Sequence, residues 1–234
     1  MSELLGVAAQ MFDIAGQRLE VAARNIANAT TPGFKREMSF SQVVSSQETA
    51  RSLGSSRPAI SSDFEAGKLV PTGNPFDLSL GSTGFFEVNG PAGLEYTRNG
   101  HFTRDDAGRL TTMSGAVLQG AGGDVIVKSD RWSVERDGTV IDAGAPVDRL
   151  RIVDFANRAA LTRSANGFSA GNEEALEVAE ARVLQGSFEA SNVSTASDMM
   201  HVMSAIRTGE TAQKLVRIYD DMLGSALQRA GEIG

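Results

Sequence analysis

The chain has 234 residues, of which 41% are hydrophobic and 22% are charged, so it can bury a substantial core and has the composition of a globular protein. It contains no cysteine and two histidines, which excludes disulfides, thiolate chemistry and metal centres built from several histidines. The formal net charge of −7 argues against a nucleic-acid partner, because phosphate binding requires clustered Lys and Arg.

The chain shows no pattern typical of a membrane or secretory segment. No stretch approaches the ~20 consecutive apolar residues of a membrane span, so no direct membrane insertion is expected. Residues 1–9 lack a basic start, and Asp13, Arg18 and Glu20 interrupt any apolar run. The sequence therefore predicts that the protein stays in the cytoplasm or leaves it by a route that cleaves nothing.

Residues 1–33 are expected to form an N-terminal helix with a wide apolar stripe. Two sets of residues recur every seven positions along it: Leu5, Phe12, Leu19 and Ile26, and three positions later Ala8, Ala15, Ala22 and Ala29. Such spacing gives an a/d seam of the coiled-coil type, in which the alanines favour close approach of a second helix. Pro32 disfavours helical geometry in Thr31, so the helix is predicted to end near Asn28. A core helix of a small bundle is the alternative interpretation.

The middle of the chain divides into a connector and a β domain. Residues 34–71 are rich in Ser, Gln, Arg and Gly, and we interpret them as an extended or partly helical connector. Residues 72–155 carry strand patterns, such as Phe76, Leu78 and Leu80 alternating with polar residues, and we assign residues 72–190 to a β domain with a return segment. Turn signals in this region are Asn89-Gly90-Pro91, Asn99-Gly100, Asp106-Ala107-Gly108 and Asp137-Gly138. These patterns predict an antiparallel β domain with tight hairpins.

The end of the β domain is ambiguous, whereas a helix clearly follows it. Within residues 72–190, the segment from Glu173 to Leu184 has helical propensity, but glycines interrupt its surroundings. Residues 191–234 predict a C-terminal helix that Ser194 or Thr195 can cap. We expect this helix to pair with the N-terminal one.

The C-terminal helix carries two adjoining apolar stripes. Their candidate interface residues are Met199, Val202, Ile206, Val216, Leu223 and Leu227 in one stripe, and Tyr219 and Met222 in the other. Two terminal helices cannot bury all of these faces against each other, so the remaining faces require partner subunits. Together with the N-terminal seam, these residues form the predicted assembly interface.

Motifs that could carry chemistry have structural explanations. Gly120-Ala121-Gly122-Gly123 faintly resembles a phosphate loop, but a strand-like segment follows it where a helix N-terminus is needed. His101 and His201 are too scattered for a catalytic triad, and Asp105 and Asp106 lack further ligands at calcium spacing. The sequence therefore predicts no enzyme activity, no catalytic, cofactor-binding or metal-binding residues, and no small-molecule substrate.

Three segments resemble the signatures of flagellar axial proteins, the family of rod and hook subunits. Segment 22–36, AARNIANATTPGFKR, is similar to the N-terminal motif, with matching positions at Asn25, Asn28, Pro32, Gly33, Phe34 and Lys35. Segment 73–110, GNPFDLSLGSTGFFEVNGPAGLEYTRNGHFTRDDAGRL, resembles the β-domain signature of rod and hook proteins. Segment 185–193, QGSFEASNV, is similar to the junction before the C-terminal helix. The chain length resembles that of proximal rod subunits more than that of distal rod or hook subunits.

The resemblance implies an α+β fold in which long, coiled-coil-like terminal helices flank an antiparallel β domain. It implies a structural subunit of the basal-body rod, the axial drive shaft that transmits torque for motility. It further implies other rod subunits as partners, export by the flagellar type III apparatus without cleavage, and a position in the rod across the periplasm. The chain departs from the family pattern at Gly209, where an aromatic residue is usual.

Three alternatives remain open at this point. One is a distal rod subunit of the same family. Another, from a different class, is a ligand-binding or enzymatic β domain with helical oligomerisation arms. A secreted adhesin with coiled-coil ends is the third.

Overall fold

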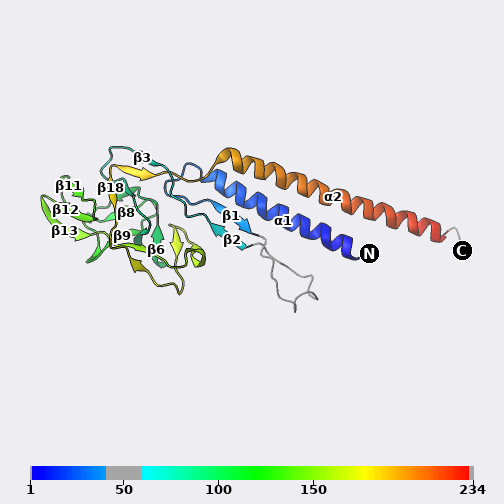
Figure 1. Ribbon diagram of the computed structural model, residues 1–234, viewed down its shortest axis with the longest axis horizontal. Coiled ribbons are helices and arrows are strands. Elements are labelled where there is room, and N and C mark those ends of the chain that lie inside the picture. The colour runs from blue at the N-terminus through cyan, green and yellow to red at the C-terminus, as the bar shows by residue number, and fades with distance from the viewer. Residues whose placement is uncertain (1, 41–58, 232–234) are drawn as a thin grey trace. The chain divides into compact units, whose positions relative to one another are not determined.

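The computed structural model describes residues 2–40 and 59–231 of the chain (Figure 1). The described residues form two compact units. The terminal unit contains those of 1–27, 37–63 and 193–234, and the β unit contains 28–36 and 64–192. In the sequence, one helix precedes the antiparallel strands of the β unit and one helix follows them, so the predicted α+β fold class is confirmed. Residues 34–71, expected as a connector, contribute strands to both units.

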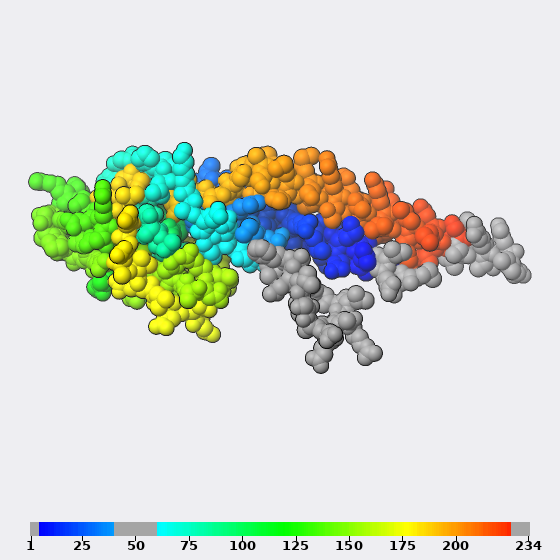
Figure 2. Space-filling view, viewed as in Figure 1, coloured from blue at the N-terminus to red at the C-terminus, as the bar shows by residue number. Residues whose placement is uncertain are grey.

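The terminal unit consists of two antiparallel helices and a pair of strands. Helix α1 (Ser2–Ala27) ends shortly before the Pro32 turn, and helix α2 (Thr195–Gly231) begins directly after Ser194. Strand β1 (Glu37–Phe40) pairs antiparallel with β2 (Ala59–Ser62). The end of α1 lies beside the start of α2, and the two helices then run side by side (Figures 1 and 2). Neither of the described helices has a stretch long and apolar enough to cross a membrane.

Small residues form the contact between the two helices. Ala8, Ala15 and Ala22 of α1 are at most 6% exposed, and Ala205 and Ala212 of α2 are at most 2% exposed. Because alanine side chains are short, two helix backbones can approach closely where they face each other. The seven-residue alanine spacing of α1 thus serves packing inside the subunit.

The β unit is built from short antiparallel strands. They are β3 (Leu69–Pro71), β4 (Leu78–Leu80), β5 (Phe85–Gly90), β6 (Gly93–Thr97), β7 (Phe102–Arg104), β8 (Leu110–Thr112), β9 (Val117–Gly120), β10 (Gly123–Asp124), β11 (Trp132–Val134), β12 (Thr139–Asp142), β13 (Ala145–Arg149), β14 (Ile152–Asp154), β15 (Thr162–Arg163), β16 (Phe168–Ser169), β17 (Leu176–Glu177), β18 (Val183–Gln185) and β19 (Ser187–Glu189). A short 3-10 helix covers Arg158–Ala160. The largest sheet has the order β15-β16-β6-β5-β9-β8-β7, with β10 beside β9, β14 beside β5 and β17 beside β14. Strands β11, β12 and β13 form a second sheet, while β4 pairs with β18 and β3 with β19.

Two apolar clusters fill the interior of the β unit. The larger cluster contains Phe86, Phe102, Leu118 and Trp132, all of them buried. The smaller cluster is aromatic, and its Tyr96 and Phe155 rings meet edge to face with centroids 4.8 Å apart. Burial of these large side chains is the main source of stability for the unit.

The segment of ambiguous propensity from Glu173 to Leu184 contains strand rather than helix. It contributes β17 and the first residues of β18, which pairs with β4. Val183 is 1% exposed and packs in the larger apolar cluster. Strand pairing and burial therefore override the helical propensity of this segment.

Candidate functional site

Most of the N-terminal signature motif belongs to the β unit. Asn25 lies in α1, whereas Asn28, Pro32, Gly33, Phe34 and Lys35 follow the helix and pack in the β unit. Gly33, Phe34 and Lys35 bond to residues of the segment that resembles the C-terminal junction, and Lys35 bonds to Glu189 across 154 positions of sequence. The fold thus brings together two signature segments from opposite ends of the chain.

A buried carboxylate holds these two segments together. The Glu189 side chain is 1% exposed, and its Oε1 accepts hydrogen bonds from Lys35 Nζ at 2.6 Å and from the Gly67 backbone N at 2.7 Å. Its Oε2 accepts a hydrogen bond from Arg98 Nη1 at 3.1 Å. The Gly33 backbone N also donates to the Glu189 carbonyl oxygen at 2.7 Å. We call Gly33, Lys35, Arg98, Glu189 and Asn192 the clasp.

Asn192 fixes the outer end of the clasp. Its Oδ1 accepts a hydrogen bond from the Arg36 backbone N at 2.7 Å, and its Nδ2 donates to the Glu65 carbonyl oxygen at 3.1 Å. Lys35 Nζ donates to the same Glu65 carbonyl at 2.6 Å. Each of these side chains satisfies backbone groups from another segment. With Arg98, the clasp therefore joins four separate stretches of chain: residues 33–36, 65–67, 98 and 189–192.

The electrostatics of the clasp depend on mutual compensation of buried charges. Burial lowers the pKa of the Arg98 guanidinium, and the nearby Glu189 carboxylate opposes this shift. Lys35 is 1% exposed and Arg98 is 6% exposed, so water solvates neither cation well. Moving such charges out of water costs several kcal/mol per ion unless close partners compensate, and Glu189 supplies that compensation to both.

Gly33 is needed in the clasp for two separate reasons. Its backbone φ is +68°, in the left-handed region that favours glycine. A Cβ atom at this position would also lie 2.2 Å from the backbone carbon of Arg98. Glycine is therefore required at this position of the chain, because the turn and the backbone at Arg98 meet too closely for any side chain.

We expect Gly33→Ala to destabilise the β unit more than Gly73→Ala. Gly73 has a similar φ of +73° but has nothing within 4 Å of an added Cβ, so it isolates the cost of backbone strain. That strain costs about 1–2 kcal/mol. The collision at Gly33 should add at least about 1 kcal/mol to the loss. Urea unfolding followed by the fluorescence of Trp132, the single tryptophan, measures the free energy of unfolding of both variants. Equal losses of this free energy would show that the approach of Gly33 to the Arg98 backbone is not tight.

An arginine covers the aromatic residue of the signature motif. The Arg163 guanidinium carbon lies 4.4 Å from the centroid of the Phe34 ring, which is a cation–π arrangement. Arg163 Nη2 also donates a hydrogen bond to the Lys35 carbonyl oxygen at 2.6 Å. Phe34 is thereby held in the β unit beside the clasp.

A second polar cluster lies inside the terminal unit. Asn25 is fully buried; its Oδ1 accepts a hydrogen bond from the Glu37 backbone N at 2.8 Å, and its Nδ2 donates to the Glu37 carbonyl oxygen at 2.9 Å. Asn25 Nδ2 also donates to Asp198 Oδ1 on α2 at 3.4 Å, and Arg24 Nε donates to Glu37 Oε2 at 2.8 Å. One amide therefore ties the end of α1 to both β1 and the start of α2.

The predicted N-terminal seam divides into two faces. Ala8, Ala15 and Ala22 are buried within the subunit, whereas Leu5, Phe12 and Leu19 are 46%, 37% and 40% exposed. Ile26 is half-buried. Ala29 lies beyond the end of α1, in the β unit, so the seam is shorter than predicted because the helix stops at Ala27. The Leu5, Phe12 and Leu19 row is the face left open.

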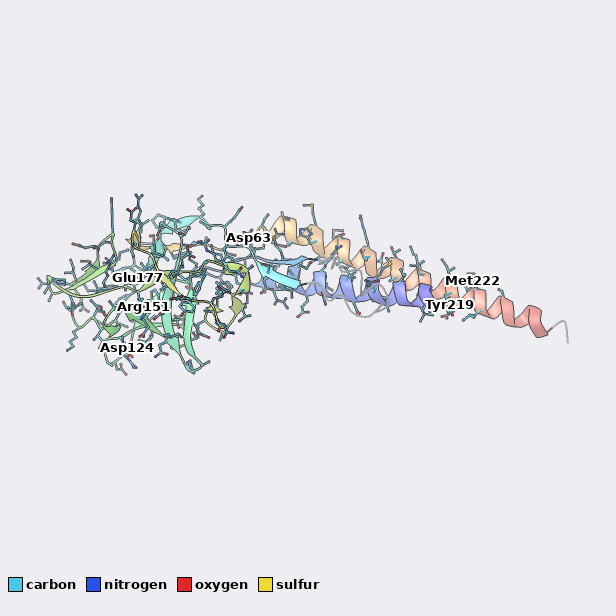
Figure 3. The ribbon with its side chains drawn as sticks, turned by 60° about the horizontal axis from the view of Figure 1, so that its bottom comes forward. Asp63, Asp124, Arg151, Glu177, Tyr219 and Met222 are labelled. Carbon is cyan, nitrogen blue, oxygen red and sulfur yellow. The ribbon has the colours of Figure 1, made fainter. Side chains whose placement is uncertain are left out.

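On α2, the residues buried within the subunit are not those of the apolar stripes predicted from the sequence. Asp198, Ala205 and Ala212 recur every seven residues and are at most 2% exposed. The stripe residues Met199, Ile206 and Met222 are instead 54%, 48% and 61% exposed. Val202, Val216, Tyr219 and Leu223 are half-buried, while the side chain of Leu227 lies outside the described residues. Tyr219 and Met222 are in the C-terminal half of α2 (Figure 3).

The motifs considered for catalysis or ion binding have structural roles. The Gly122 backbone N donates to Asp148 Oδ1 at 3.1 Å in a β turn, and Asp105 Oδ1 accepts from backbone N atoms of its own turn. His101 Nδ1 lies 2.6 Å from the buried Asp77 Oδ1, which ties two neighbouring strand segments together. The described part of the chain contains no group of three side chains arranged to hold a metal ion.

Sequence reasoning did not single out Arg98 or Glu189, nor the contact of Asp198 with Asn25. Arg98 and Glu189 are charged residues inside the signature-like segments 73–110 and 185–193, and Asp198 is the acidic residue in the first turn of α2. The available signal for a functional role was a charged side chain inside a motif rather than in a loop. Its buried partners could not be read from the sequence because they are distant along the chain.

Comparison with known proteins agrees with this geometry. Residues 15–35 match the family model described as flagella basal body rod protein, residues 80–142 match the flagellar hook protein FlgE/F/G D1 domain, and residues 184–229 match the flagellar basal body rod FlgEFG protein C-terminal region. Each matched region contributes residues to the clasp: Gly33 and Lys35, then Arg98, then Glu189 and Asn192.

Curated relatives extend over nearly the whole chain. The Escherichia coli K12 flagellar basal-body rod protein FlgF is 31% identical over 229 residues, covering 89% of this chain and 90% of the relative. The FlgF of Caulobacter vibrioides is 29% identical, with 93% of each chain covered. The basal-body rod protein FlgG of Bacillus subtilis is 28% identical, with 88% of this chain and 90% of the relative covered.

These matches define the class of protein. The chain belongs to the family of flagellar basal-body rod proteins. Within that family it is FlgF-like, as the resemblance in the sequence predicted.

Proposed function

We propose that the protein is a structural subunit of the flagellar basal-body rod and that it assembles through its terminal unit. The observation that carries this proposal is the row of large apolar side chains left open on α1, Leu5, Phe12 and Leu19, which are 46%, 37% and 40% exposed. Rows of this kind mark protein contact surfaces, because burying them in a partner removes apolar area from water. The relatives reported above carry the name of basal-body rod proteins.

The length difference between the helices supports the same proposal. Helix α2 has 37 residues and α1 has 26, so the last turns of α2 extend past the start of α1 (Figure 1). Ile218 and Met222, near this extension, are 54% and 61% exposed. Helices from neighbouring rod subunits would cover these turns in a coiled-coil-like arrangement, and the predicted assembly residues would lie at those contacts.

The finer features of the proposal follow from family membership. Partners are other rod and basal-body subunits, and the location is the flagellar basal body. We further infer a proximal position in the rod, export by the flagellar type III apparatus without cleavage of a signal peptide, and a rod that crosses the periplasm. In this assembly the terminal units form the shaft that transmits torque, and the β units lie outside it.

Complementation of a strain that lacks this gene tests the proposal. We expect such a strain to be non-motile and the full-length protein to restore swimming. Basal bodies purified in detergent from the restored cells should contain the protein with its N-terminal peptide intact in mass spectra. Restored swimming with no protein in purified basal bodies would contradict the proposal, and so would a deletion strain that swims normally.

A further inference from the structure

The start of α2 carries three methionines that share one exposed surface. Met199, Met200 and Met203 are 54%, 67% and 58% exposed. Met203 follows Met199 by four residues and Met200 by three, so the three side chains are neighbours on the helix surface. We call them the methionine face. The start of α2 forms part of the outer surface of the terminal unit in Figure 2, where it is orange.

The described methionines at other positions provide internal comparisons. Met11 and Met38 are half-buried in the terminal unit. Met113 is 76% exposed, but it lies in a turn of the β unit rather than on a helix. Met222, further along α2, is 61% exposed but has no other methionine within four positions of it. The methionine face is therefore distinguished by three highly exposed thioethers that lie together on a helix that we propose to be buried on assembly.

Exposed thioethers react with hydroperoxides. A lone pair of the methionine Sδ attacks the terminal oxygen of hydrogen peroxide, the O–O bond breaks, an S–O bond forms, and water leaves after a proton shift. The sulfur loses two electrons and the peroxide gains them, so the product is methionine sulfoxide. This converts a flexible apolar side chain into a polar one, and sulfoxide reductases reverse it.

We propose that the methionine face is an oxidation-sensitive modification site that controls whether the subunit can enter the rod; this rests on the proposed function. A sulfoxide oxygen on this face must lose its water when α2 is covered by a neighbouring subunit. Without a hydrogen-bond donor opposite, each oxidised thioether lowers association by at least about tenfold. In an assembled rod the neighbour shields the thioethers, so oxidation acts on the free subunit.

Peroxide footprinting tests the protection of the face. The purified full-length subunit and purified basal bodies are treated with hydrogen peroxide, and tandem mass spectrometry follows one added oxygen at each methionine. In the free subunit we expect Met199, Met200 and Met203 to oxidise faster than Met11 and Met38. In basal bodies the oxidation rates of these three methionines should fall, while the rate at Met113 should stay unchanged and serves as the internal reference. Unchanged rates at the methionine face in basal bodies would overturn the proposal.

A variant that cannot be oxidised tests the control of assembly. Met199→Leu, Met200→Leu and Met203→Leu are combined, because Leu keeps an apolar side chain of similar volume. Strains with this variant or the original chain, both also carrying Met222→Leu to remove the remaining exposed methionine of α2, are exposed to peroxide while new flagella form, and each is compared with its own untreated culture. We expect the original chain to lose about tenfold more new flagella than the triple variant. The single variant Met113→Leu should not protect.

The outcomes separate this proposal from the proposed function. Equal losses with the original chain and the triple variant would overturn the modification site while leaving the rod subunit intact. Failure of the original chain to restore swimming without peroxide would overturn the proposed function itself. Recovery of flagellation after overexpression of a sulfoxide reductase would support the modification site.

Discussion

Replacing Glu189 with alanine is expected to destabilise the β unit by about 3–5 kcal/mol, as found when one member of a buried charge cluster is removed. The Glu189 carboxylate is 1% exposed and is shared by Lys35 Nζ at 2.6 Å and Arg98 Nη1 at 3.1 Å. The variant keeps both cations in the interior and removes the carboxylate between them. Urea unfolding monitored by Trp132, which is buried in the β unit, reports the loss.

Two further variants identify the cause of that loss. Glu189→Gln keeps the side-chain shape but removes the charge, so a loss close to that of Glu189→Ala shows that charge compensation is the important contribution. Arg104→Ala is the surface control, because Arg104 Nη2 bonds Asp130 Oδ1 at 2.7 Å with the Asp130 side chain 91% exposed. Its cost should stay below about 1 kcal/mol. A Glu189→Ala loss no larger than that of Arg104→Ala would mean that the clasp does not hold the segments.

Phe12→Asp and Ala15→Glu are expected to abolish motility for different reasons. Phe12 is 37% exposed on the open row of α1, so aspartate there leaves the subunit folded but places a charge where a neighbouring helix should bury an apolar ring. Ala15 is 6% exposed between the two helices, so glutamate there forces the helix pair of the same subunit apart. The two substitutions introduce the same charge three positions apart.

Circular dichroism of the purified subunits separates the two effects. We expect Phe12→Asp to keep the helical signal and to change the free energy of unfolding by less than about 1 kcal/mol. Ala15→Glu should lose a large part of the helical signal. Gln10→Glu, at an exposed position off the apolar row, controls for added charge and should swim normally. A swimming Phe12→Asp strain would show that the open row is not an assembly surface.

Local sequence signals predict the elements of this fold better than their contacts. The heptad spacing and Pro32 identify α1, and Asn-Gly and Asp-Gly pairs mark hairpin turns in the β unit. Propensity fails for the segment from Glu173 to Leu184, because β18 gains more from pairing with β4 and burying Val183 than from a helix. A short strand is stabilised by pairing with another strand, and the local sequence does not indicate which strand that is.

The functional surfaces show the same limit. Seven-residue spacing correctly groups Leu5 with Phe12 and Ala8 with Ala15, but it cannot say which set faces the second helix of the same chain. The sequence predicted only part of the clasp. Lys35 could be identified because it belongs to the family motif, whereas its carboxylate partner Glu189 is 154 positions away. Pairing across such distances is decided by the tertiary fold.

The position of the clasp has a mechanical consequence. The chain passes between the terminal unit and the β unit after Ala27, Arg36, Asp63 and Asn192. Gly33 and Lys35 lie between the first two crossings, and Asn192 is the residue at the last one. A pulling or twisting load carried along the backbone from the helices therefore enters the β unit at the clasp, before it reaches the sheets. Its ion pairs and hydrogen bonds share that load in parallel, so the clasp is expected to resist unfolding before the sheets are loaded when a single subunit is stretched.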